Sequence, residues 1–146
     1  NLNLSFNQGV KSRVYLVEKP VHNKSRVPVY FLDFGPGSKV KFEPFPEQTG
    51  STTTISIDDF VKENNIEKVD FIKMDIEGAE LYALEGAKET IRKFRPKLAI
   101  ASYHSLNDLF NIPKWILDLD LGYEIFIDHY TIHTEETVCF AILKNK

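Results

Sequence analysis

Residues 69–103 alternate between strand-like and helix-like patterns, and this alternation constrains the fold more than any other feature of the chain. The runs "VDFIKMDI" (69–76) and "KLAIASY" (97–103) are apolar enough to be buried strands. Between them, residues 78–94 repeat apolar side chains at three- and four-residue spacing, which is typical of a helix with one buried stripe. Two strands joined by a helix pair in parallel through a right-handed crossover. We therefore expect 69–76 and 97–103 to be adjacent, parallel strands.

The segment after this unit predicts a helix and two further strands. The stretch "NIPKWILDLDL" (111–121) indicates a helix with Pro113 near its start and Gly122 past its end. The runs 123–130 and 137–143 lie close enough in sequence to form a hairpin at the edge of the sheet. The order of elements therefore predicts two parallel strands beside a terminal antiparallel pair.

Smaller elements are expected in the first 64 residues. A strand is predicted at 13–17, and a further strand at 51–57 precedes a helix from Asp58 or Asp59 to about Asn64. The runs 27–34 and 39–45 flank Gly35-Pro36-Gly37-Ser38, which indicates a hairpin turn. Residues 27–57 should then form a small antiparallel insertion. The fold class is predicted to be α/β, with a mainly parallel sheet that ends in an antiparallel hairpin.

Composition excludes several classes of function. The 146 residues carry a net charge of -3, so the chain has neither a nucleic-acid footprint nor an electrostatic membrane anchor. No apolar run approaches the roughly 18 residues of a membrane span. The single cysteine, Cys139, excludes disulfides and cysteine-based zinc sites within the chain. We expect a cytoplasmic protein in a reducing compartment.

Polar side chains follow the two predicted core strands. Asp75 and Glu77 come after the first strand, Tyr103 and His104 come after the second, and His129 lies in the terminal hairpin. In open α/β sheets, ligands bind outside the carboxyl ends of the strands. These residues are therefore candidates for one site.

The same charged residues can instead have purely structural roles. Lys73 and Asp75 share one face of the strand, about 6–7 Å apart, and can pair, with Lys73 as a buried tether. Asp75 or Glu77 can cap the next helix, and Glu80 is expected to interact only with the dipole of that helix. A lone histidine commonly pairs with a backbone carbonyl. His22 and His133 are expected in loops and Trp115 in the core.

The run K-x-D-x-E-G-A-E, from Lys73 to Glu80, is the most specific motif of the chain. Together with "RPKLAIASYH", "DLFNIP" and "GYEIFIDHY…ETVCFA", it resembles the C-terminal half of the FkbM-type methyltransferases, from about Arg13 to Leu143. Those are class I enzymes with a Rossmann-like sheet, which use S-adenosylmethionine and mostly methylate sugar or polyketide hydroxyls. The resemblance implies the same reaction and cofactor here.

The resemblance also implies that 1–146 is a partial domain. The family's glycine-rich cofactor loop and acidic ribose-binding residue belong to its first two strands, and neither is in this sequence, because "FGPGS" sits in a hairpin turn. Asn1 would precede the third strand, 13–17. Of the residues present, Glu18 and Lys19 would lie near the adenine. We expect the 146 residues alone to bind the cofactor weakly and to be inactive.

Roles on the acceptor side follow from the same resemblance. Asp75 is predicted to orient the acceptor hydroxyl or the cofactor's amino group, with Glu77 also at the cofactor, and His104 or His129 to be the base. Tyr103 and His104 are predicted to contact a small-molecule acceptor, possibly a sugar hydroxyl. A divalent metal on Asp75 and a histidine would suit an oxygen-rich acceptor, but we find no full ligand set and predict no metal site.

Two other functions are alternatives. A non-catalytic α/β module could bind a partner or a polysaccharide through the exposed 27–57 hairpin. A glycosyltransferase should have a D-x-D motif in a loop, and the only match, Asp118-Leu119-Asp120, lies in a helical stretch. The identity of the acceptor stays open.

Overall fold

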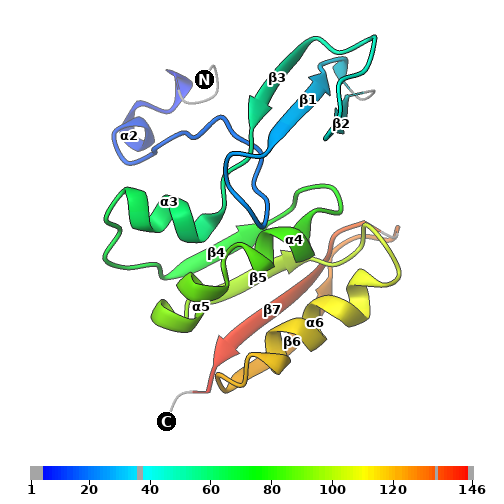
Figure 1. Cartoon of the computed structure of the whole chain (residues 1–146). Coiled ribbons are helices and arrows are strands. Elements are labelled where there is room, and N and C mark those ends of the chain that lie inside the picture. Colours follow the sequence, from blue (N-terminus) through cyan, green and yellow to red (C-terminus); the bar gives the residue numbers. More distant parts are fainter. Residues whose placement is uncertain (1–4, 36–37, 134, 145–146) are drawn as a thin grey trace.

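The structure is a computed structural model that describes residues 5–35, 38–133 and 135–144. It contains a four-stranded sheet of order β4-β5-β7-β6 and a three-stranded sheet of order β2-β1-β3. Figure 1 shows the three-stranded sheet at one end of the molecule, with the helices α3 and α4 between it and the larger sheet. The fold is therefore α/β with two sheets.

The central strands are arranged as the sequence predicts. β4 (Phe71–Met74) pairs in parallel with β5 (Lys97–Ala101), with Ile72 opposite Leu98. β6 (Tyr123–His129) and β7 (Thr137–Leu143) form the expected antiparallel hairpin, with β6 at the edge. β7 also pairs antiparallel with β5. Because the described strands contain a single parallel pairing, the sheet is mixed, and the prediction of a mainly parallel sheet was wrong for this part of the fold.

The expected helix over 78–94 is broken into two. α4 spans Glu80–Glu85 and α5 spans Lys88–Phe94. At the break, a Cβ built on Gly86 would lie 2.3 Å from the backbone oxygen of His22. The helical spacing of apolar residues continues through the break, so the sequence pattern does not reveal it. Glycine is needed at position 86 because the loop at His22 passes too close for a side chain.

The last helix begins earlier than expected. α6 spans Asp108–Asp118, so Pro113 lies inside it rather than near its start. Proline is common in the first helical turn, and that preference led to the wrong boundary. The helix ends at Leu119, and Gly122 lies past its end with a φ of +81°, as predicted.

Helices α4, α5 and α6 pack on one face of the larger sheet (Figure 1). β4 alternates exposed and buried side chains, so that Ile72 and Met74 face the helices while Phe71 and Lys73 do not. This alternation matches the predicted faces of the strand. The core consists of apolar side chains from the sheet and the three helices, including Leu84, Ile91, Leu98, Ile100, Ile112, Ile116 and Cys139.

The small sheet confirms the predicted antiparallel unit within 27–57. β1 (Pro28–Leu32) lies between β2 (Lys39–Lys41) and β3 (Gly50–Thr53). Pro36 and Gly37 of the predicted turn lie outside the described residues. β3 ends before position 57, because Ser56 caps α3 (Ile57–Glu63) by accepting a hydrogen bond of 3.1 Å from the Asp59 amide.

The predicted strand at 13–17 is not a strand. A short helix, α2 (Gln8–Lys11), comes before it, and no strand of the described chain pairs with residues 13–17. Tyr15 and Leu16 are 76% and 50% exposed. β-propensity acts through packing against neighbouring strands, so an apolar run without such a neighbour stays irregular. Among the described helices, none combines the length and the apolar character of a membrane span.

Candidate functional site

A tight loop carries the chain from the end of β4 into α4 and presents three carboxylates. Glu77 and Gly78 both have positive φ angles, of +57° and +91°. This conformation is unfavourable for glutamate and natural for glycine. Glu80 closes the loop, because its Oε1 accepts a 2.7 Å hydrogen bond from the Ile76 amide. The loop thereby holds Asp75, Glu77 and Glu80 at the carboxyl end of β4.

Asp75 is held by two donors. Lys73 donates to Oδ2 at 3.2 Å, and the Tyr103 hydroxyl donates to Oδ1 at 2.9 Å. Burial alone would raise the pKa of Asp75, but the hydrogen bonds from Tyr103 and Lys73 outweigh it and lower the pKa below its usual value. The same bond to Asp75 is the main reason that the pKa of Tyr103 is raised to about 12. Asp75 is therefore an ionised carboxylate, and Tyr103 stays a donor.

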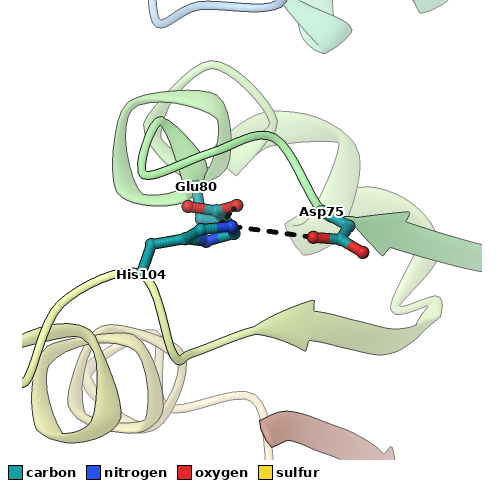
Figure 2. A group of neighbouring side chains, drawn as sticks. All are labelled: Asp75, Glu80 and His104. Carbon is teal, nitrogen blue, oxygen red and sulfur yellow. Dashed lines mark ion pairs between the residues drawn. The ribbon is translucent and has the colours of Figure 1, made fainter. Parts of the chain in front are cut away.

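His104 lies among the three carboxylates. Figure 2 shows it between Glu80 and Asp75. Its Nε2 is 3.8 Å from Asp75 Oδ1 and 3.5 Å from Glu77 Oε2, and its Nδ1 is 3.2 Å from Glu80 Oε1. Although the last distance is short, its geometry is not that of a hydrogen bond, and neither ring nitrogen has a hydrogen-bond partner among the described residues. The side chain of His104 is only 10% exposed.

An open cavity of about 1170 Å³ adjoins this cluster and is called the acceptor cavity below. Its polar lining comes from the segment after β5, from the end of β6, the start of β7 and the loop between them, and consists of Ser102, Tyr103, His104, Ser105, His129, His133, Glu135 and Thr137. His129 shares a 2.8 Å hydrogen bond with Thr137 through its Nδ1. The two candidate bases named from the sequence, His104 and His129, thus line one cavity. Tyr103 lies beside His104, with ring centroids 4.2 Å apart, and bonds Asp75 through its hydroxyl.

Comparison with known proteins identifies the family. Residues 1–125 match the model of the Methyltransferase FkbM domain. This chain belongs to the FkbM methyltransferase family. The crystal structure of Methyltransferase FkbM from Methylobacillus flagellatus KT superimposes with a TM-score of 0.70 and 27% sequence identity, over 97% of this chain and 32% of that chain. The chain thus spans about a third of that structure's length. No curated protein matches.

In this FkbM chain, the K-x-D-x-E-G-A-E run forms the end of β4, the tight loop and the start of α4. It supplies the three carboxylates that surround His104. The predicted pair of Lys73 and Asp75 is confirmed. Lys73 is not a buried tether, because its side chain is 61% exposed. Glu80 does occupy the first turn of α4, but it is 1% exposed and touches His104, so its environment is not that of a surface dipole partner.

The two residues expected near the adenine lie at the surface of the described chain. Glu18 and Lys19 are exposed. Lys19 lines a second cavity of about 1170 Å³ together with Glu77 and Gly78, whereas Glu18 lines neither this cavity nor the acceptor cavity. His22 and His133 are in loops, as expected. Trp115 is half-buried against the core and its indole N–H donates to Glu85.

The sequence did not reveal that Glu80 belongs to the site. Its side chain reaches back toward β4 only because the loop turns sharply at Glu77 and Gly78. A usable signal was present, since a glutamate that directly follows a Gly-Ala turn begins the next helix and can bond the loop before it.

Proposed function

We propose that this chain forms the acceptor side of an S-adenosylmethionine-dependent O-methyltransferase. The observation that carries the proposal is the convergence of Asp75, Tyr103 and His104 at the carboxyl ends of β4 and β5, beside an open polar cavity. Family membership supports methyl transfer, and ligands of Rossmann-like sheets bind at this edge.

The residues present suit a cationic methyl donor. S-adenosylmethionine supplies a methyl group on a positively charged sulfur. Asp75 is an ionised carboxylate whose side chain is 30% exposed, so it can attract that charge or the donor's amino group. The ring of Tyr103 offers a face to the same cation. Glu77 and Lys19 line the second cavity and are the residues we assign to the remaining part of the donor.

The acceptor is a small molecule or sugar with a free hydroxyl. The acceptor cavity presents serine, threonine, tyrosine and histidine side chains, which are suited to hydrogen-bonding an oxygen-rich ligand. Asp75 orients the hydroxyl that is methylated. His104 or His129 accepts its proton, because both rings line the cavity and imidazole is the most common general base in enzymes.

The test is methyl transfer by the full-length protein from isotopically labelled S-adenosylmethionine to a panel of sugars and other hydroxyl compounds. In the Asp75→Asn variant, kcat should fall by about 100-fold or more, the scale of one positioned electrostatic group. The melting temperature should hardly change, because Lys73 is exposed and losing its pair costs less than about 1 kcal/mol.

Asp70→Asn is the matched control, since Asp70 directly precedes β4 at its opposite end and pairs with the exposed Lys68. It should be fully active. An Asp75→Asn protein with unchanged kcat would contradict the proposal. Failure to bind the donor or to methylate any acceptor would instead support the non-catalytic binding module.

A further inference from the structure

The cluster around His104 has more negative charge than its neighbours balance. Carboxylate oxygens of Asp75, Glu77 and Glu80 lie within 3.8 Å of one imidazole. Lys73 is the nearest lysine, but it contacts only the far oxygen of Asp75 and is largely exposed. Glu77 is 90% exposed and is screened by water, but Glu80 is buried and Asp75 is only 30% exposed, and like charges repel more strongly where burial excludes water. A cation at the buried end of the cluster would relieve this repulsion.

Buried polar atoms at the same place have no partner. Glu80 is 1% exposed, and its Oε2 has no hydrogen-bond partner in the described part of the chain. Both nitrogens of His104 are buried and unpartnered within the same residues. Leaving such groups unpaired costs free energy, so an interior site of this kind normally holds ordered water or an ion. Figure 2 shows Glu80 directed at the ring of His104, and the ring directed at Asp75.

The distances from His104 Nε2 to the nearest carboxylate oxygens fit coordination of a shared metal ion better than direct hydrogen bonds. The separations of Nε2 from Asp75 Oδ1 and from Glu77 Oε2, 3.8 and 3.5 Å, are too long for normal hydrogen bonds. Two donors on one cation, with bonds of about 2.1 Å, lie roughly 3.0–4.2 Å apart. One ligand atom each from Asp75, Glu80 and His104 lies within 4.8 Å of the others. Asp75 and Glu77 lie at Nε2 and Glu80 lies at Nδ1, so binding of one ion requires the Glu80 side chain to turn its unpartnered Oε2 toward Nε2.

We propose that Asp75, Glu80 and His104 bind one divalent first-row metal ion, with Glu77 beside it as a further oxygen donor. Two carboxylates with one imidazole favour an ion such as Mn²⁺ over Ca²⁺, which prefers oxygen ligands alone. This assignment goes beyond the sequence, which indicated no full ligand set, because Glu80 was not counted as part of the site.

The metal ion would act on the acceptor hydroxyl, and this role rests on the proposed function. Of the proposed ligands, His104 lines the acceptor cavity, so an acceptor hydroxyl bound there would lie next to the ion's imidazole ligand. Coordination lowers the pKa of that hydroxyl. Its proton leaves to water or to His129, and the methyl carbon moves from sulfur to oxygen as the carbon–sulfur bond breaks. His104 is then a ligand, and of the two predicted bases His129 is the one that accepts the proton.

The test measures metal binding without methyl transfer. Full-length protein is stripped with a chelator and titrated with MnCl₂, and free Mn²⁺ is followed by electron paramagnetic resonance. We expect one site that is weakened at least about 10-fold in each of Asp75→Asn, Glu80→Gln and His104→Gln. Asp70→Asn, at the other end of β4, should bind as the parent does.

Hyperfine coupling from an imidazole nitrogen to bound Mn²⁺ should appear in the parent protein, and this readout remains valid if a variant fails to fold. Absence of Mn²⁺ binding, or binding that survives all three substitutions, overturns the metal site. Methyl transfer that proceeds unchanged in chelator, by a protein that does not bind Mn²⁺, overturns the metal site but leaves the proposed function intact. Bound Mn²⁺ without any methyl transfer supports the metal site and removes the proposed function.

Discussion

Glu80 links the backbone of the loop to the ring of His104. One oxygen accepts the Ile76 amide, and the carboxylate as a whole places a buried negative charge 3.2 Å from His104 Nδ1. Glutamine has the same shape and can still accept the amide hydrogen bond, but it lacks the charge. We predict that Glu80→Gln lowers kcat/KM for methyl transfer by about 10- to 100-fold, the usual effect of removing a charged group that supports a functional histidine.

The melting temperature of Glu80→Gln should stay the same or rise, because the substitution removes a buried charge. Initial rates and a thermal melt on one preparation measure both quantities. Glu85→Gln is the control, since Glu85 ends the same helix and contacts Trp115 rather than the cluster. A fully active Glu80→Gln protein would show that the carboxylate only shapes the loop.

The sequence identified the residues of the site that follow strands directly. Asp75, Tyr103 and His104 were found because the carboxyl ends of parallel strands meet at one edge, which is a property of the topology. Glu80 was underestimated because its direction depends on two positive φ angles in the preceding loop. Such angles are set by glycine and by local strain, and spacing alone does not reveal them.

At the scale of elements, α5 depends on a residue from another helix. No side chain of its own N-cap, Ala87, bonds its first turn. Asp58 of α3 does so instead, because its two carboxylate oxygens accept the amides of Thr90 at 2.7 Å and Glu89 at 3.1 Å. A carboxylate at this position also opposes the positive end of the helix dipole.

We therefore predict that Asp58→Ala lowers the free energy of unfolding by about 1 kcal/mol, as measured by urea denaturation. Asp58→Asn should lose less, because its amide oxygen can still accept one of the two hydrogen bonds. Asp70→Ala, an exposed aspartate outside any cap, should change the free energy by less than about 0.5 kcal/mol. Equal losses for Asp58→Ala and Asp70→Ala would refute the capping role.

Elements whose pattern is local were predicted well, and elements whose limits depend on distant contacts were not. The strands β4 to β7 follow from apolar runs that face one buried layer. The break between α4 and α5 depends on His22, whose backbone lies against Gly86. The irregular segment at 13–17 has strand composition, but no neighbouring strand pairs with it in the described chain.

At the scale of the molecule, the two sheets are joined through the loop that precedes the small one. The ring of His22 stacks on Tyr82 of α4, with centroids 5.0 Å apart and planes at 13°, and meets the edge of Phe42 beyond β2 at 5.1 Å. Val21 also bridges to Ile55 beside α3. The small sheet is thus held against the loop and helix that carry the carboxylates, where it forms one wall of the cavity shared by Lys19 and Glu77.

Cys139 is a natural probe of the centre of the larger sheet, because its thiol can be modified chemically. It lies in β7 between Ile100 of β5 and Ile127 of β6, under the helical layer, and is fully buried. A thiol reagent reaches it only when β7 separates from its neighbours or the helices leave the sheet, which is close to complete unfolding of the core. Burial also raises the pKa of the Cys139 thiol to about 11.

Both effects slow alkylation, and they can be separated. At pH 8 a pKa of about 11 leaves roughly one thiol in 1000 ionised, against about one in four for a free cysteine with a pKa near 8.5. We predict that iodoacetamide modifies Cys139 in the native full-length protein at least about 1000-fold more slowly than in concentrated urea, measured by mass spectrometry of the peptide that contains it. If reaction requires global opening, the native rate should rise with added urea in parallel with the unfolding equilibrium. A native rate that rises tenfold per pH unit but ignores urea would instead mean that the reagent reaches the thiolate within the folded sheet, and that β7 is not the rigid centre of the core.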